Sequence, residues 1–194
     1  MNGYNTTPKH KVFISFHHAD QSYKEYLETQ WAGQFDGFVS RSVGDGDINP
    51  NLSTEYTRQL IRDNFIADAT VTIVLVGTGT WRRKHVDWEI GSSIRDTKRN
   101  SRTGLLGIFL PTYPLNGNSY NPYTIPPRLY KNVERGYAKI YSWPSSPEDL
   151  KTWIHEAFQR REDSIRQRIG AIHPDNTYPG FAHNRSESQP HWSY

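Results

Sequence analysis

The alternation of short apolar runs with amphipathic segments places the strongest constraint on the fold. The clearest run, residues 70–76 (TVTIVLV), is nearly continuous in apolar and β-branched residues, as expected for a central parallel strand covered on both faces. Similar short runs predict further strands over residues 11–16, 37–41, 104–110 and 137–141. Because these runs alternate with helical patterns, we predict one parallel sheet with helices on both faces.

The segments between the runs carry the periodicity of amphipathic helices. Apolar residues recur at spacings of three and four, which predicts one buried stripe for each helix. Helices are expected near residues 22–33, after a cap at Asn51 or Ser53, over roughly 81–98, and from Ser146 to about 169.

The chain divides by composition into one domain and two flanking segments. Residues 1–10 read as a polar N-terminal arm and residues 11–169 as a single α/β domain, which suits a length of 194 residues. Within it, residues 111–136 are rich in Pro, Asn and Tyr and are predicted to form an irregular insert. Residues 170–194 form a polar tail that is expected to be either loosely docked or disordered.

Composition excludes several classes of site. The absence of cysteine excludes disulfides, thiolate zinc sites and cysteine nucleophiles. The formal net charge is only +3 and the basic runs are short, so no nucleic-acid partner is expected. No apolar run is long enough to cross a membrane and no signal peptide is visible, which predicts a cytoplasmic protein without a membrane partner. The nucleotide-binding P-loop and the hydrolase elbow G-x-S-x-G do not occur.

The residues that follow the predicted strands are the first candidates for a site. Ligands of open parallel sheets bind beyond the carboxyl ends of the strands. The candidate binding residues at these ends are Phe16, His17, Asp20, Arg41, Ser42, Gly77 and Trp81. Some of these positions also have an ordinary structural interpretation. His17 fits an exposed loop. Residues 77–80 (GTGT) fit a tight turn as well as a phosphate site at a helix N-terminus.

Glu89 is the acidic residue whose position is most unusual. It stands beside Ile90 on an apolar stripe and one turn after His85, so it is expected at the boundary of the buried face. Partial burial there would raise the pKa of its carboxyl group, whereas an ordinary helical Glu is solvated. His85 and Glu89 could together contact a metal, but two ligands are too few, and no metal is expected.

Three segments together resemble a known family. They are residues 12–17 (VFISFH), residues 71–76 followed by Gly77, and the pattern R-R-x-x-V-x-x-E-I over residues 82–90. In order and spacing they resemble the bacterial TIR-like domains, and most closely the TIR protein of the Thoeris anti-phage system. The resemblance covers about residues 10–110 and implies a flavodoxin-like, three-layer α/β fold.

The resemblance also implies an activity. In the family, the Glu that corresponds to Glu89 is catalytic, and NAD⁺ is a substrate rather than a cofactor. Thoeris members convert NAD⁺ into a cyclic ADP-ribose isomer, a second messenger that switches on a separate effector protein. Self-assembly into a homo-oligomer is also compatible with the family. Under this interpretation the strand-end residues and His85 would bind NAD⁺, and Phe16, Trp81 or Trp88 could stack its rings.

The sequence departs from the family pattern at some positions, and other functions remain open. His85 stands where TIR enzymes often carry Trp, and the chain reads LPT over residues 110–112, where Thoeris relatives place a polar residue after the fourth main strand. One alternative is a non-catalytic TIR-type interaction module. Another is a flavodoxin-like signalling or nucleoside-processing domain. A receiver domain is disfavoured, because Asp20 alone does not supply the clustered acids that it needs.

Overall fold

The computed structural model describes residues 10–31, 37–39, 53–180, 188 and 190–192. They form a five-stranded, wholly parallel sheet in the order β2-β1-β3-β4-β5. The strands are β1 (Lys11–Ser15), β2 (Gly37–Val39), β3 (Val71–Val76), β4 (Gly104–Phe109) and β5 (Ala138–Tyr141). The predicted parallel α/β sheet is confirmed. Four strands agree with the predicted bounds to within one residue at each end, and residues 40 and 41 of the second lie outside the described part.

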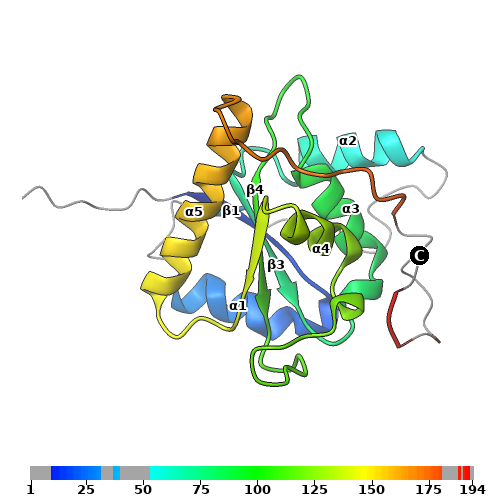
Figure 1. Ribbon diagram of the computed structural model, residues 1–194, viewed down its shortest axis with the longest axis vertical. Coiled ribbons are helices and arrows are strands. Elements are labelled where there is room, and N and C mark those ends of the chain that lie inside the picture. The colour runs from blue at the N-terminus through cyan, green and yellow to red at the C-terminus, as the bar shows by residue number, and fades with distance from the viewer. Residues whose placement is uncertain (1–9, 32–36, 40–52, 181–187, 189, 193–194) are drawn as a thin grey trace, which may run out of the picture.

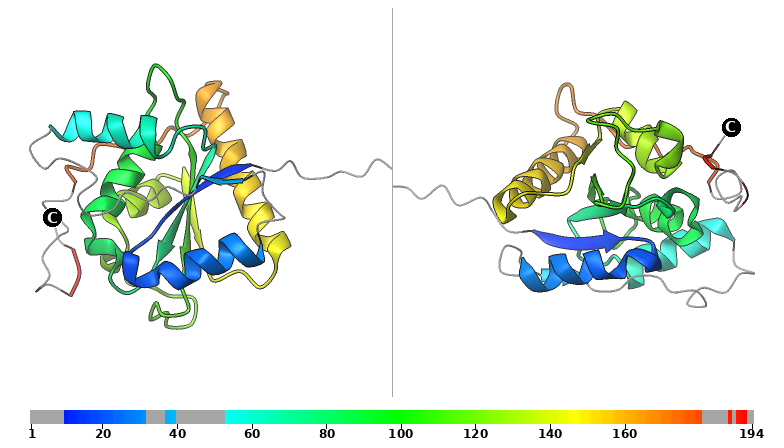
Figure 2. Two further views of the ribbon diagram at one scale, coloured as in Figure 1. Left: turned by 180° about the vertical axis from the view of Figure 1, so that it is seen from behind. Right: turned by 90° about the horizontal axis from the view of Figure 1, so that it is seen from below.

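Helices cover both faces of this sheet, as Figures 1 and 2 show. Helices α1 (Gln21–Gln30) and α5 (Pro147–Ile165) cover one face, and α2 (Thr54–Asn64), α3 (Lys84–Ser93) and α4 (Pro127–Glu134) cover the other. Within the described residues, the short 3₁₀ helices η1 (His18–Asp20), η3 (Thr80–Arg82) and η4 (Pro122–Thr124) each lie between a strand and the α-helix that follows it.

Side chains alternate along each strand and so build two core layers. Val12, Ile14 and Phe16 of the first strand and its end pack into the layer under α1 and α5. Phe13 instead packs against α2, where it belongs to the same core cluster as Ile61 of that helix. The odd and even positions of β1 therefore face different helices, which decides which of its residues can reach α3.

The predicted helix over residues 81–98 is shorter and interrupted. Arg83 has extended backbone angles (φ −93°, ψ 121°), which separates η3 from α3. At the other end of the chain, α5 stops at Ile165 rather than near residue 169, and Gln167 has a φ of 50°, which a continuing helix does not allow.

The prediction of an irregular insert over residues 111–136 is wrong in its second half, because that segment contains α4. Its buried face includes Arg128 and Asn132 as well as Leu129. The helix is only eight residues long and begins in a run of prolines, so its short periodic pattern does not stand out in the sequence. The prolines at positions 126 and 127 suit the first turn of a helix, although they looked like loop residues in the sequence.

The described part of the tail is docked on the domain. Tyr178 and Trp192 are buried, and the indole Nε1 of Trp192 donates a hydrogen bond to the carbonyl of Pro122 at 3.2 Å. The sequence left residues 170–194 either loosely docked or disordered, and the described residues of this tail are docked. Among the described helices, none is long and apolar enough to cross a membrane.

Candidate functional site

Glu89 lies in the middle of α3 and is completely buried, with 0% of its surface exposed. The helix packs into the core through Val86 and Ile90, and this places Glu89 against the sheet. Its Oε2 accepts a hydrogen bond from the hydroxyl of Ser15 at 2.6 Å. The boundary position predicted from sequence is therefore wrong, because the residue lies fully inside.

Ser15 reaches Glu89 because of its place in β1. It is the last residue of the strand and lies two residues after Phe13, so its side chain is on the same face of the sheet, toward α2 and α3. The hydroxyl is itself fully buried. A buried carboxylate bonded to a buried hydroxyl thus joins α3 to the carboxyl end of β1.

His85 makes a second connection between the same two elements. Its Nε2 lies 3.1 Å from the backbone carbonyl oxygen of Phe16, the residue after β1. His85 precedes Glu89 by one helical turn, so both side chains lie on the same side of α3. His85 and Glu89, which the sequence placed one turn apart on one helix, therefore both contact residues at the end of β1.

Asp20 lies against the turn that follows β3. A Cβ atom added to Gly77 would lie 2.5 Å from Oδ2 of Asp20, so the carboxylate occupies the space that only glycine leaves there. Burial raises the pKa of the Asp20 carboxyl above its usual value, and the charge of Arg83 and a hydrogen bond with Thr80 partly oppose that rise.

The turn itself is closed by side-chain and backbone contacts. The N–H of Gly77 donates to the hydroxyl of Thr80 at 2.8 Å. A Cβ atom on Gly79 would lie 3.5 Å from both the Cδ2 of His17 and an Nη of Arg83. His17, Asp20 and Arg83 therefore gather around the turn of residues 77–80, which gives this corner both acidic and basic groups.

The aromatic candidates are packed rather than open. Phe16 is 6% exposed and Trp81 is 1% exposed, so neither offers a free ring face for a ligand in this conformation. The ammonium group of Lys24 lies 5.7 Å from the Phe16 ring centroid, and the guanidinium carbon of Arg82 lies 5.3 Å from that of Trp81. These contacts place positive charge beside both rings.

Two of the predicted binding residues, Arg41 and Ser42, lie outside the described residues. The preceding strand β2 ends at Val39, which is paired with Phe13 of β1. Within the described ranges, no group of three or more His, Asp or Glu residues could hold a metal ion.

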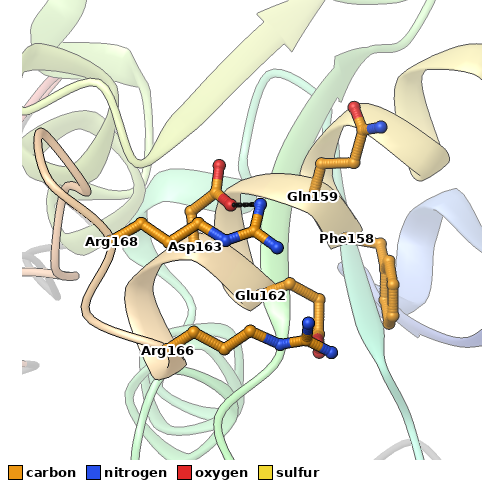
Figure 3. Close-up of a pocket in the computed structure, with 6 residues that line it drawn as sticks. All are labelled: Phe158, Gln159, Glu162, Asp163, Arg166 and Arg168. Carbon is orange, nitrogen blue, oxygen red and sulfur yellow. Dashed lines mark hydrogen bonds and ion pairs between the residues drawn. The ribbon is translucent and has the colours of Figure 1, made fainter.

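Among the described residues, two of the pockets have linings that do not include Glu89. One, of about 340 Å³, is lined by Ser22, Tyr23, Tyr26 and Trp143. The other, of about 510 Å³, lies on the second half of α5 and is shown in Figure 3. In it Arg168 pairs with Asp163 at 2.6 Å and Arg166 with Glu162 at 3.1 Å, so its charges already balance one another. Neither pocket combines a carboxylate with free cationic groups, and we keep the end of β1 as the candidate site.

Sequence reasoning gave no individual role to Ser15, Thr80 or Arg83. Ser15 had one available signal, since it is the polar residue that ends an otherwise apolar strand, at a position that alternates with Ile14. Thr80 and Arg83 lie in the segment after the third strand that the sequence placed near the site, but their contacts with Asp20 depend on how the turn after β3 folds back.

The comparison with known families matches residues 13–113, just over half of the chain, to the family described as "Thoeris protein ThsB, TIR-like domain". The matched segment runs from β1 to the end of β4 and includes Ser15, His85 and Glu89. The resemblance seen in the sequence is thereby confirmed. The comparison with curated proteins gave no match.

Proposed function

Because this chain belongs to the family of Thoeris ThsB TIR-like domains, we propose that it cleaves NAD⁺ and that Glu89 is the catalytic carboxylate. The observation that carries the proposal is the position of Glu89: an acidic side chain held inside the domain at the carboxyl end of β1, where parallel sheets bind ligands. The proposal places the reaction in the cytoplasm, with NAD⁺ as substrate and without a cofactor.

The chemistry suits a single carboxylate. The bond between the ribose anomeric carbon and the nicotinamide nitrogen breaks, and its electron pair leaves with nicotinamide, which becomes neutral and needs no acid catalyst. The ribose develops oxocarbenium character, which a nearby negative charge stabilises. A nucleophile then adds to the anomeric carbon and loses its proton.

The identity of that nucleophile decides the product. Attack by water gives ADP-ribose, whereas attack by a group of the same ADP-ribose gives a cyclic isomer. Exclusion of water and proximity within the site favour cyclisation. We propose the cyclic product, acting as a second messenger for a separate effector protein in anti-phage defence, in line with the family to which the chain belongs.

Full burial of Glu89 adds a step to this proposal. A carboxylate with no exposed surface can contact NAD⁺ only after neighbouring groups move aside. The active form is then a conformation in which the end of β1 and the turn after β3 open, through self-assembly or another activating signal.

The same burial favours one alternative, a non-catalytic interaction module of the TIR type. In that case Glu89 serves only to join α3 to β1 through Ser15. The two functions differ in what a conservative substitution of Glu89 does, so one experiment separates them.

The test compares the wild-type chain with the Glu89→Gln variant. Gln keeps the shape and can still accept the Ser15 hydrogen bond, but it removes the negative charge. We expect nicotinamide release from NAD⁺ to fall by about 10²- to 10⁴-fold, the range for single electrostatic contributors to catalysis. Nicotinamide and ADP-ribose species are measured by chromatography, and thermal unfolding is measured alongside.

Glu25→Gln is the matched control, because Glu25 is an exposed acid on α1. It should leave both activity and unfolding temperature unchanged. Full activity in Glu89→Gln would overturn the catalytic assignment, and lost activity with a collapsed unfolding temperature would support the structural role. If purified wild-type protein is silent, protein from phage-infected cells is assayed in the same way.

A further inference from the structure

A buried ion pair lies on the side of α3 that faces away from β1. Asp87 and Glu89 are two residues apart, so their side chains leave the helix about 200° from each other. The Arg128 guanidinium of α4 donates to both carboxylate oxygens of Asp87, from Nε at 2.9 Å and from Nη2 at 3.2 Å. The side chains are 0% and 1% exposed, so this is a fully enclosed, two-pronged contact between α3 and α4.

Asn176, in the segment after α5, joins this pair to the backbone of α3. Its Oδ1 accepts a hydrogen bond from Nη1 of Arg128 at 2.8 Å, and its Nδ2 donates to the carbonyl oxygen of Gly91 at 3.0 Å. Gly91 is two residues beyond Glu89 and within the last turn of α3, where carbonyls have no partner inside the helix. One amide therefore bonds α4 and the end of α3 together.

The segment that carries Asn176 is itself fastened to α4. We call residues 173–178 the C-terminal strap. The Asn132 side chain donates to the carbonyl of Asp175 and accepts from its N–H, each at 2.8 Å. Tyr178 is buried, with its ring centroid 5.7 Å from the Arg128 guanidinium carbon. Figure 1 shows the chain after α5 running across to the side of the molecule where α3 and α4 lie.

We infer that Asn176 is a positioning residue for Glu89: the C-terminal strap fixes α3 from behind so that the carboxylate stays at the end of β1. Helix α3 is bonded to β1 on one side through Glu89 and His85, and to Arg128 and Asn176 on the other. Without the Asn176 amide, the end of α3 loses its link to α4 and the helix can shift relative to β1. The effect on catalysis rests on the proposed function, whereas the effect on α3 does not.

The test uses the full chain with Asn176→Ala, and Thr177→Ala as the matched control. Thr177 is the next residue of the C-terminal strap; it is exposed, and its hydroxyl bonds Asp175 rather than α3. Asn176→Asp is the second variant, because it keeps an acceptor for Arg128 but puts a carboxylate oxygen, which cannot donate, in place of the N–H that bonds Gly91. Each variant is studied well below its unfolding temperature.

Two measurements are made on each variant. Small displacements of catalytic groups lower rates by up to about 10²-fold, so kcat for nicotinamide release should fall at least about tenfold in Asn176→Ala while KM stays within about twofold. Amide hydrogen exchange across residues 86–93, which reports local opening of α3, should become faster by about tenfold or more. Asn176→Asp should change exchange in the same direction, and Thr177→Ala should change neither quantity.

The outcomes separate this inference from the proposed function. If α3 exchanges at the wild-type rate in both Asn176 variants, the C-terminal strap does not hold the helix and the inference is overturned. Faster α3 exchange with unchanged kcat would show that the strap stabilises α3 without positioning Glu89, which also overturns it. If the wild-type chain releases no nicotinamide even when it is taken from phage-infected cells, the proposed function fails, and hydrogen exchange alone decides whether the strap holds α3.

Discussion

The hydrogen bond between Ser15 and Glu89 connects residues that are 74 positions apart in the chain. Both groups are completely buried, so water cannot replace either partner if the other is removed. Hydrogen bonds to charged groups contribute about 1.5–3 kcal/mol to stability, more than neutral ones do. This contact is therefore expected to matter for folding as well as for the placement of the carboxylate.

Ser15→Ala is expected to lower the free energy of unfolding by about 1.5–3 kcal/mol, because it removes the hydroxyl that bonds a buried carboxylate. The loss should be smaller when Glu89 is already Gln, since the two residues act on one interaction. Denaturant unfolding of the two single variants and the double variant measures this coupling. Strictly additive losses would contradict it, and Ser22→Ala, at an exposed position on α1, should have no effect.

At the residue scale, the sequence shows which helical acid is unusual but not how it is held. The spacing of His85 and Glu89, and the apolar residues around them, mark one face of α3. The partner Ser15 depends on the pairing of β1 with β3 and on the packing of α3 above them. A contact of this kind follows from the tertiary fold, which periodicity alone does not specify.

At the scale of elements, α5 packs directly on the beginning of β4. A Cβ atom on Gly104 would lie 2.3 Å from the carbonyl oxygen of Ala157 and 2.6 Å from its carbonyl carbon. Both are backbone atoms, which cannot rotate away as a side chain can. The absence of a side chain at Gly104 therefore sets how closely the helix approaches the sheet.

Gly104→Ala is expected to destabilise the domain by about 1–3 kcal/mol or more, because the methyl group forces α5 away from β4. Gly79→Ala is the matched control: its Cβ would have no neighbour closer than 3.5 Å, and the residue has an ordinary negative φ of −107°. Thermal and denaturant unfolding report both. Equal stability of the two variants would show that α5 can move at little cost.

The strands and the longer helices could be predicted from their apolar patterns, whereas a short helix inside a proline-rich segment could not. The strands are short apolar runs, and α5 begins at Ser146 with a capping box that the sequence also signals through Pro147 and Asp149. Helix α4 escaped prediction because it is only eight residues long and begins with prolines, which read as loop residues. Its buried arginine and asparagine have partners in α3 and the tail that the sequence does not reveal.

At the scale of the whole molecule, three distant parts of the chain meet at Arg128. Asp87 comes from α3, Asn176 from the C-terminal strap, and Arg128 itself from α4. The family match ends at residue 113, so it includes Asp87 but neither of the other two. The TIR-like part of the chain is thus completed by a C-terminal part that the comparison does not cover, and a buried charge forms the junction.

The junction makes a prediction about global stability. Arg128→Met keeps the bulk of the side chain but leaves the Asp87 carboxylate buried without its guanidinium, which typically lowers stability by about 3–5 kcal/mol. The double variant Asp87→Ala/Arg128→Met leaves no uncompensated charge and should be less destabilised than Arg128→Met alone, despite a second substitution. Arg166→Met removes an exposed ion pair with Glu162 and should change stability by no more than about 1 kcal/mol. Denaturant unfolding monitored by tryptophan fluorescence gives all three values. A double variant that is destabilised more than Arg128→Met alone would contradict this account of the buried pair, and would mean that α3, α4 and the C-terminal strap are held together by their apolar contacts instead.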